Sequence, residues 1–201
     1  MARKPVAPRV LRADAQRNRD RVLEIAQAVF AAEGLDVPID EIARRAGLGI
    51  GTLYRHFPTK QALVAAIVHD RMSRLADQAE ALAGAADPGP AFFALVELLA
   101  DAMRRKKDLG QAITGIDMRE VTAAARTRMT AAMTRLLERA QRAGAVRGEL
   151  QYEDVMALVS ATLPSPYRPA GSPARLLAVI CDGLRPPPRP AAAPRKPRAR
   201  R

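Results

Sequence analysis

The sequence predicts an all-α protein of about nine helices, with a small three-helix unit followed by a larger helical bundle. Strong helix formers (Ala, Leu, Arg and Glu) are plentiful across the 201 residues, and β-branched runs are rare. Apolar residues recur at the i, i+3, i+4, i+7 spacing of one helix face through most of the chain. Gly and Pro separate these periodic segments, as they commonly do between helices.

The first helix is predicted from about Gln16 to Glu33. An apolar stripe on one face predicts that it packs across the next two helices; the stripe consists of Val22, Ile25, Ala26, Val29 and Phe30. Gly34 ends the helix. We expect residues 1–14, which precede it, to form a flexible basic arm.

Two short helices are predicted next, at about 39–46 and 49–56. Gly47 supplies the left-handed conformation that reverses the chain after the first of them. Leu53 and Phe57 form the inner side of the second. The first has its own apolar face, made of Ile39, Ile42, Ala43 and Ala46. Two short helices around a glycine turn predict a helix-turn-helix.

The outer side of the second short helix suits the major groove of B-DNA. Small residues at its start allow the backbone to approach closely, and hydroxyl, aromatic and basic groups follow them. Ile50 offers an apolar contact to a thymine methyl group, whereas phosphate contacts fix the register. The predicted DNA-binding residues are Gly49, Ile50, Gly51, Thr52, Tyr54, Arg55, His56 and Lys60.

Residues 17–66 resemble the DNA-binding domain of the TetR/AcrR family of bacterial transcriptional regulators. Three motifs carry the resemblance in one order and at fixed spacing: Ile-Ala-x-x-Ala-Gly at 42–47, Gly-Thr-Leu-Tyr-Arg-His-Phe at 51–57 and Pro-Thr-Lys-x-x-Leu at 58–63. The resemblance covers about a quarter of the chain. It implies phosphate contacts from Tyr54, His56 and Lys60.

The chain departs from the family pattern at two helix starts. Pro38 stands where the family usually has Ser or Thr, and Gly49 stands where it often has Ser. Glycine is tolerated at an N-cap, so the helices survive, but a hydroxyl contact to DNA is lost. The glycines here also imitate part of a dinucleotide-binding loop. That interpretation fails because a helix, not a strand, precedes them.

The remainder of the chain predicts six further helices. The first begins at Lys60, after the helix-ending Pro58 and the N-cap Thr59, and continues to about Ala83. At 1.5 Å per residue it is roughly 36 Å long, enough to link two domains. The others are expected at about 90–107, 108–114, 117–142, 152–163 and 173–184. A loop stiffened by Pro164, Pro166 and Pro169 separates the last two.

The net charge of +12 is concentrated at the two ends of the chain. Residues 1–12 carry four basic groups and residues 186–201 carry six, with no acids in either. Ten of the 33 basic groups therefore lie outside residues 13–185, which keep 23 basic against 21 acidic groups. We expect the tails to be solvated, with a salt-dependent affinity for DNA as their possible contribution.

These observations divide the chain into four parts. The predicted parts are a flexible basic arm at 1–14, a helix-turn-helix DNA-binding domain at 15–60, an effector-binding and dimerisation domain at 61–185, and a basic, Pro-rich disordered tail at 186–201.

The last two helices carry more apolar surface than a terminal hairpin should leave in water. A two-fold dimer in which both hairpins form a four-helix bundle would bury it, as the resemblance also implies. Packing within one chain is the alternative. The predicted dimerisation residues are Val155, Met156, Val159, Leu163, Leu176, Leu177, Ile180 and Leu184.

The resemblance further implies that the larger domain holds a small effector among its helices. Methionine suits an adaptable apolar cavity, although Met and Phe at helical spacing are more often core than pocket. The candidate effector-binding residues are Met72, Phe92, Phe93, Leu99, Met103, Met129 and Met133, with Gln111 and Thr114 as polar anchors.

We therefore expect a dimeric transcriptional repressor that a hydrophobic or amphipathic effector releases from a near-palindromic operator. One alternative is a DNA-binding regulator without an effector, switched by a protein partner or by its own concentration. The third hypothesis, a helical ligand carrier or an enzyme, lacks support, since no nucleophile beside a His, acidic pair or cofactor loop is found.

We expect no cofactor and no metal site, because two His and one Cys lie far apart in the sequence. Cys181 is alone and cannot form an internal disulfide. Together with the lack of a signal peptide and of an apolar run of 18 residues, this predicts a cytoplasmic protein without membrane contact.

Overall fold

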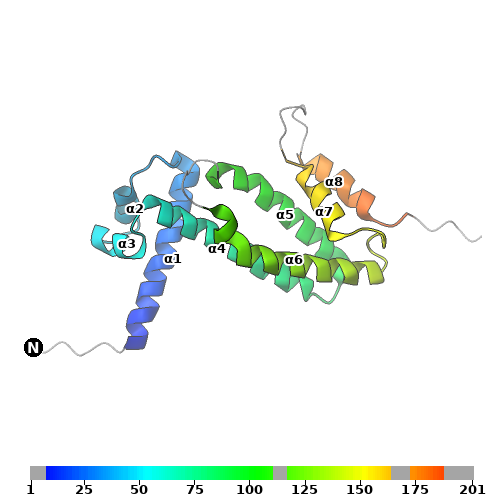
Figure 1. Ribbon diagram of the computed structural model, residues 1–201, viewed down its shortest axis with the longest axis horizontal. Helices are drawn as coiled ribbons and strands as arrows, with labels where there is room; N and C mark the ends of the chain where they lie inside the picture. Colours follow the sequence, from blue (N-terminus) through cyan, green and yellow to red (C-terminus); the bar gives the residue numbers. More distant parts are fainter. Residues whose placement is uncertain (1–7, 111–116, 164–172, 188–201) are drawn as a thin grey trace, which may run out of the picture.

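The structure, a computed structural model, describes residues 8–110, 117–163 and 173–187, and all regular structure in these ranges is α-helical. Figure 1 shows α1, α2 and α3 at one end of an elongated molecule and α7 and α8 toward the other. The helices are α1 (Pro8–Glu33), α2 (Ile39–Arg45), α3 (Ile50–His56), α4 (Lys60–Ala83), α5 (Pro88–Gly110), α6 (Met118–Arg142), α7 (Tyr152–Ser160) and α8 (Pro173–Leu184). The all-α prediction is confirmed, with eight helices in the described residues instead of about nine.

Helix α1 begins at Pro8, eight residues before the predicted start at Gln16. The segment expected to be a flexible arm up to residue 14 is therefore helical from Pro8 onward. The physical reason is that proline is favoured at the first position of a helix, where its missing N–H costs nothing. No glycine or further proline interrupts the chain between Pro8 and Glu33.

Two boundaries in the larger part of the chain also differ from prediction. Helix α5 runs on to Gly110 and takes in the start of the separate helix expected at 108–114, whose remainder lies outside the described residues. Helix α7 ends at Ser160 instead of Leu163. Beyond Ser160 the N–H groups of Thr162 and Leu163 bond to the carbonyl oxygens three residues back, not four, so the chain tightens into a turn. Pro164 and the rest of its loop lie outside the described residues.

Two hydrophobic clusters fill the molecule, and α4 contributes to both. The smaller cluster joins α1, α2, α3 and the first half of α4 through Leu63, Val64 and Ile67. The larger joins α5 to α8 with the second half of α4 through Leu75 and Ala79. The smaller cluster therefore extends beyond residue 60.

Polar contacts hold α4 against α6 along the larger cluster. Arg128 of α6 pairs with Glu80 of α4 at 2.5 Å and with Asp77 at 2.6 Å. Arg139 donates to the carbonyl oxygens of Ala83 and Ala85, both at 2.7 Å, and so satisfies acceptors at the end of α4.

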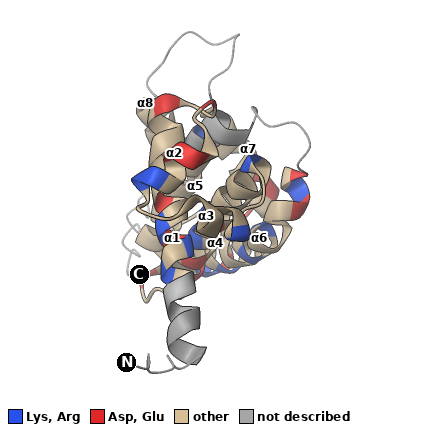
Figure 2. Cartoon of the chain, turned by 90° about the vertical axis from the view of Figure 1, so that its left-hand side faces the viewer, with Lys and Arg blue, Asp and Glu red and all other residues tan. Residues whose placement is uncertain are grey.

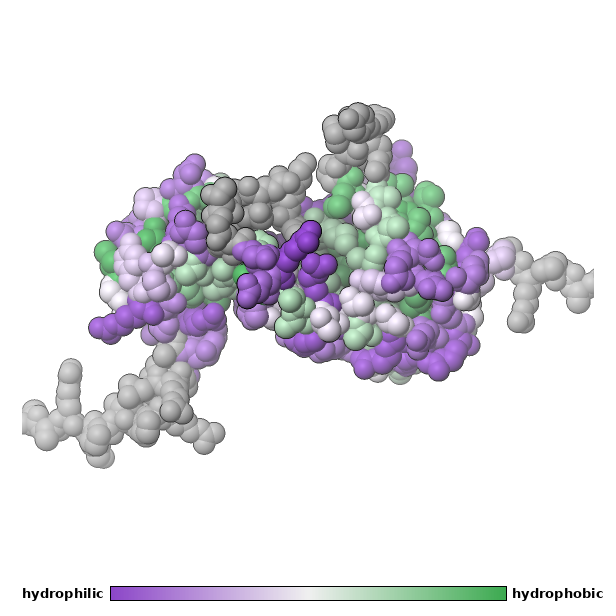
Figure 3. All heavy atoms as spheres, in the orientation of Figure 1, coloured by the Kyte–Doolittle hydropathy of each residue, from purple (hydrophilic) through white to green (hydrophobic). Residues whose placement is uncertain are grey.

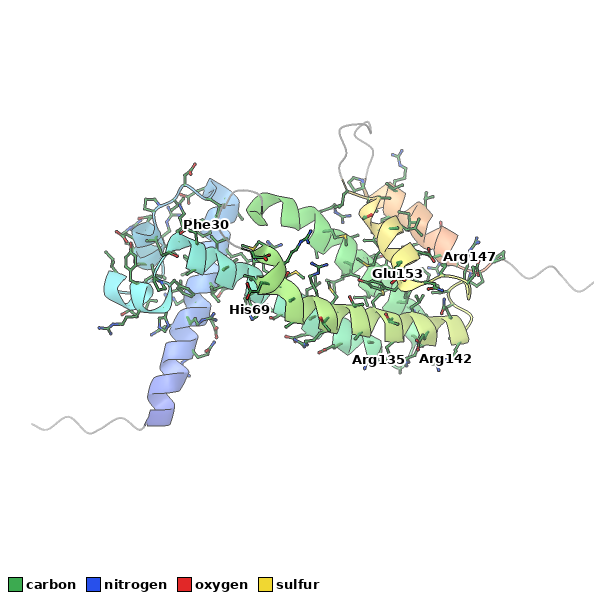
Figure 4. All side chains as sticks on the ribbon, in the orientation of Figure 1. Phe30, His69, Arg135, Arg142, Arg147 and Glu153 are labelled. Carbon is green, nitrogen blue, oxygen red and sulfur yellow. The ribbon has the colours of Figure 1, made fainter. Side chains whose placement is uncertain are left out.

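A third contact lies nearer the small cluster, where His69 Nδ1 is 3.2 Å from the carbonyl oxygen of Val121. Figure 4 shows His69 beside the first turns of α6. Among the residues described, no helix combines the length and apolar character that crossing a membrane requires.

The turn between α2 and α3 depends on Gly47, which has a φ of +67°. Its N–H bonds to the carbonyl oxygen of Arg44, and the next N–H, of Leu48, bonds to that of Ala43. These bonds close α2 and direct the chain into α3. A side chain at residue 47 would be strained by this backbone conformation even though space is available around it.

We predict that Gly47→Ala lowers the free energy of unfolding by about 1–2 kcal/mol, the cost of a left-handed L-residue. The matched control is Gly148→Ala, at an open position without positive φ. It should change stability by less than about 0.5 kcal/mol. Denaturant titration followed by circular dichroism measures both, and equal losses in the two variants would contradict the assigned role of Gly47.

Candidate nucleic-acid interface

Helix α3 is held in place by its inner face. Leu53 and Phe57 are buried in the small cluster, and the Phe57 N–H bonds to the Leu53 carbonyl oxygen at 2.8 Å as the helix closes. Gly49 is the N-cap, with extended backbone and no side-chain cap. The helix is followed at once by Thr59, whose hydroxyl oxygen accepts from the Ala62 N–H at 3.0 Å and starts α4.

The outer face of α3 is open to solvent. Ile50 is 51% exposed and Tyr54 is 41% exposed. Arg55, Gly49 and Gly51 are also exposed, and a Cβ at either glycine would meet no atom within 4 Å. Gly49 and Gly51 therefore leave the backbone accessible at the start of the helix, on either side of Ile50.

The remaining predicted DNA-binding residues lie around the same helix. Thr52, His56 and Lys60 are half-buried. The Lys60 ammonium group sits 5.9 Å from the centre of the Phe30 ring, and the Arg19 guanidinium sits 5.6 Å from the centre of the Phe57 ring. Such cation–π contacts place these charges at the edge of the three-helix unit.

Tyr54 makes a contact that the sequence did not suggest. Its hydroxyl donates a hydrogen bond to Asp40 Oδ1 on α2 at 3.1 Å. This bond raises the pKa of Tyr54 above its ordinary value, with smaller contributions from desolvation and from the Asp40 charge. No spacing rule could have found the pair, because the residues stand on different helices and are 14 positions apart.

The arginines of α2 are already paired. Arg44 and Arg45 both bind Glu41, at 2.6 and 2.7 Å, and Arg45 also binds Glu33 of α1. Hydrogen bonds from Arg44 and then Arg45 lower the pKa of Glu41 to about 2. Figure 2, which views the molecule from this end, shows acidic and basic segments together on α2. Arg45 therefore joins α2 to α1, whereas Arg44 pairs within α2.

The structure gathers the described effector-binding candidates on one cluster. Phe92, Phe93, Leu99 and Met133 are buried, with the two phenylalanine rings edge-to-face at 5.4 Å. Met72, Met103 and Met129 are half-buried against them. Gln111 and Thr114 lie outside the described residues.

A hollow does occur on the same domain, but on the outer face of α6. Its lining residues are Arg119, Ala123, Arg126, Thr127, Thr130 and Ala131, and none of them was predicted. Elsewhere on this domain, Asp101 and Arg104 form an ion pair on α5.

Five of the eight predicted dimerisation residues are covered by the chain itself. Val155, Val159, Leu177, Ile180 and Leu184 are buried in the larger cluster of the chain. The other three, Met156, Leu163 and Leu176, are half-buried.

Two other apolar side chains of this hairpin lie at the surface of the chain. Val179 is 62% exposed and Leu158 is 38% exposed. Figure 3 shows hydrophobic atoms gathered at the surface over α7 and α8. The sequence indicates this exposure, because apolar residues surround nearly the whole circumference of α8. Some of them therefore remain exposed whichever face of the helix is buried.

Comparisons with known proteins follow the same division of the chain. Residues 22–67 match the family described as bacterial regulatory proteins of the tetR family. Residues 87–186 match the C-terminal domain of SbtR-like transcriptional regulators. An HTH-type transcriptional regulator of Staphylococcus aureus is 46% identical over 54 residues, which are 26% of this chain and 29% of that protein. The chain thus spans under a third of the curated relatives that it matches.

Two solved structures are similar over most of the chain. A TetR transcription regulatory protein of Mycobacterium vanbaalenii is 45% identical, with 87% of this chain and 99% of that chain covered and a TM-score of 0.72. A TetR transcriptional regulator of Streptomyces coelicolor is 34% identical, with 84% and 98% covered and a TM-score of 0.65.

We predict opposite effects of Gly51→Ala on folding and on DNA binding. Alanine should stabilise α3 by about 0.5–1 kcal/mol. The added methyl group should raise the Kd for a specific duplex roughly tenfold, or about 1.4 kcal/mol, if the backbone approaches DNA here. Thermal unfolding and fluorescence anisotropy measure the two effects.

The matched control is Gly148→Ala, because Gly148 is also open, has no positive φ and lies outside both α3 and the α7–α8 hairpin. It should change stability by less than about 0.5 kcal/mol and leave the Kd unchanged. Unchanged DNA affinity in Gly51→Ala would show that this backbone does not approach DNA.

Proposed function

The chain belongs to the TetR family of DNA-binding transcriptional regulators, and from that premise we propose that it is a dimeric repressor released from its operator by a small hydrophobic or amphipathic effector. Regulators of this family are not enzymes. The proposed place of action is the cytoplasm.

The exposed outer face of α3 is the observation that carries the DNA-reading role. A seven-residue helix with open glycines at its start fits a major groove, in which Ile50 would contact a thymine methyl group. Phosphate contacts are assigned to the hydroxyl, imidazole and cationic groups around it: Thr52, Tyr54, Arg55, His56 and Lys60. The separation of the two hydrophobic clusters supports a DNA-binding unit followed by a regulatory unit.

Dimerisation is assigned to the α7–α8 hairpin, through side chains that the chain itself leaves open. Val179 and Leu158 would form its centre, with the half-buried Met156, Leu163 and Leu176 around them. Two such hairpins can pack as a four-helix bundle. The dimer would hold two copies of α3 roughly 34–36 Å apart, which calls for a near-palindromic operator.

The effector is assigned to the larger cluster, where three half-buried methionines lie beside buried phenylalanines. Methionine side chains repack easily around an apolar guest. An effector would release DNA if it bound more tightly to an arrangement of α4 in which the distance between the two copies of α3 no longer matches the operator.

One observation favours a second candidate function. The described effector-binding candidates pack against one core cluster, and the hollow on α6 is lined by none of them. A regulator switched by a protein partner or by its own concentration would need no cavity there.

A selection of bound sequences from random duplex DNA tests the proposal directly. The full-length protein, at near-physiological salt, should recover a near-palindrome, and the Tyr54→Ala, Lys60→Ala double variant should not. Release of the selected duplex by amphipathic compounds would support release by an effector. If no such compound released the duplex, the second candidate function would be supported. Salt-sensitive binding without sequence preference, equal in both proteins, would instead assign DNA affinity to the basic tails.

The dimer assignment predicts that Val179→Glu raises the dimer dissociation constant at least about tenfold, because two buried valines become charged. Sedimentation velocity measures this. The control Ala81→Glu, at an exposed position of α4, should leave the dimer intact. A wild-type protein that sediments as a monomer at micromolar concentration would contradict the assignment.

A further inference from the structure

Asp40 and Tyr54 join α2 to α3 on the solvent side of the helix-turn-helix. The Tyr54 hydroxyl donates to Asp40 Oδ1 at 3.1 Å, and both residues are exposed. The contact therefore lies on the surface that we propose to meet DNA.

A tyrosine hydroxyl carries one proton and donates one hydrogen bond. The Asp40 carboxylate and a DNA phosphate are both acceptors without a proton to give at neutral pH. Tyr54 hence cannot donate to Asp40 and to a phosphate at the same time. A phosphate contact from Tyr54 requires that the bond to Asp40 break.

The charges around Asp40 strengthen this conflict. Its neighbour Glu41 is compensated by Arg44 and Arg45. In the described part of the chain, no cation pairs with Asp40, whose contact is the Tyr54 hydroxyl. Its negative charge therefore lies beside Tyr54 with no paired cation in the described residues, and it repels an approaching phosphate.

We propose that Asp40 is a positioning residue that holds the Tyr54 hydroxyl in the free protein and competes with a backbone phosphate for its proton. This inference rests on the proposed role of α3 as the DNA-reading helix. Because the Asp40–Tyr54 bond exists in the free protein and not in the complex, its free energy is subtracted from the DNA affinity. Asp40 thus sets how tightly the protein binds DNA without touching it.

The test is a double-mutant cycle on the full chain, with the selected duplex at one fixed salt concentration. Asp40→Ala should lower the Kd about three- to tenfold, the size of one charge-assisted hydrogen bond at an exposed site. Tyr54→Phe alone should change the Kd less than about twofold, because it removes one bond from each state. In the Asp40→Ala background it should raise the Kd about three- to tenfold, because there only the phosphate bond is lost.

Two further variants control for charge and for folding. Asp36→Asn, in the turn before α2, removes one negative charge from the same unit and should change the Kd less than about twofold. Asp40→Asn keeps an uncharged acceptor at the start of α2 and should raise affinity less than Asp40→Ala does. It replaces the alanine variant in the cycle if that variant fails to fold.

Equal effects of Tyr54→Phe in the two backgrounds would overturn the inference. So would weaker DNA binding by Asp40→Ala at an unchanged melting temperature, because Asp40 would then assist the DNA contact. Either result leaves α3 as the DNA-reading helix. Failure of the wild-type protein to select any sequence would overturn the proposed function, and this inference with it.

Discussion

The continuity of α4 is the constraint on which the rest of the structure depends. This single helix of 24 residues supplies buried side chains to both hydrophobic clusters, Leu63 and Ile67 to one and Leu75 and Ala79 to the other. Neither cluster can complete itself without α4. The position of α3 is therefore fixed, through the small cluster, to whatever fixes the second half of α4.

Local rules predicted most of the fold. The bounds of α4 and α8 follow from residues that act within one turn, such as the cap at Thr59. The predicted helix bounds were wrong where one residue type can either end or begin a helix. A proline ends one helix and begins another, which is why the start of α1 at Pro8 was misplaced. At the end of α5 no residue strong enough to stop a helix stands before Gly110.

Only those parts of the candidate site that depend on residues close together in the sequence could be predicted. The exposed face of α3 follows from the spacing of Leu53 and Phe57 within one helix. The bond between Asp40 and Tyr54 depends on how two helices cross, which no periodicity encodes. Likewise, an apolar stripe shows that Val155 is buried but not whether its own chain or a partner buries it.

Three residues, His69, Arg128 and Arg139, join α4 to α6 through polar contacts along their length. The last of them, Arg139, holds the end of α4 through the carbonyl oxygens of Ala83 and Ala85. With that end as a pivot, a rotation of about 10° over the roughly 36 Å of α4 would sweep its other end through about 6 Å. Successive base pairs are separated by about 3.4 Å, so a small angular change deep in the bundle is enough to shift α3 by more than one base pair.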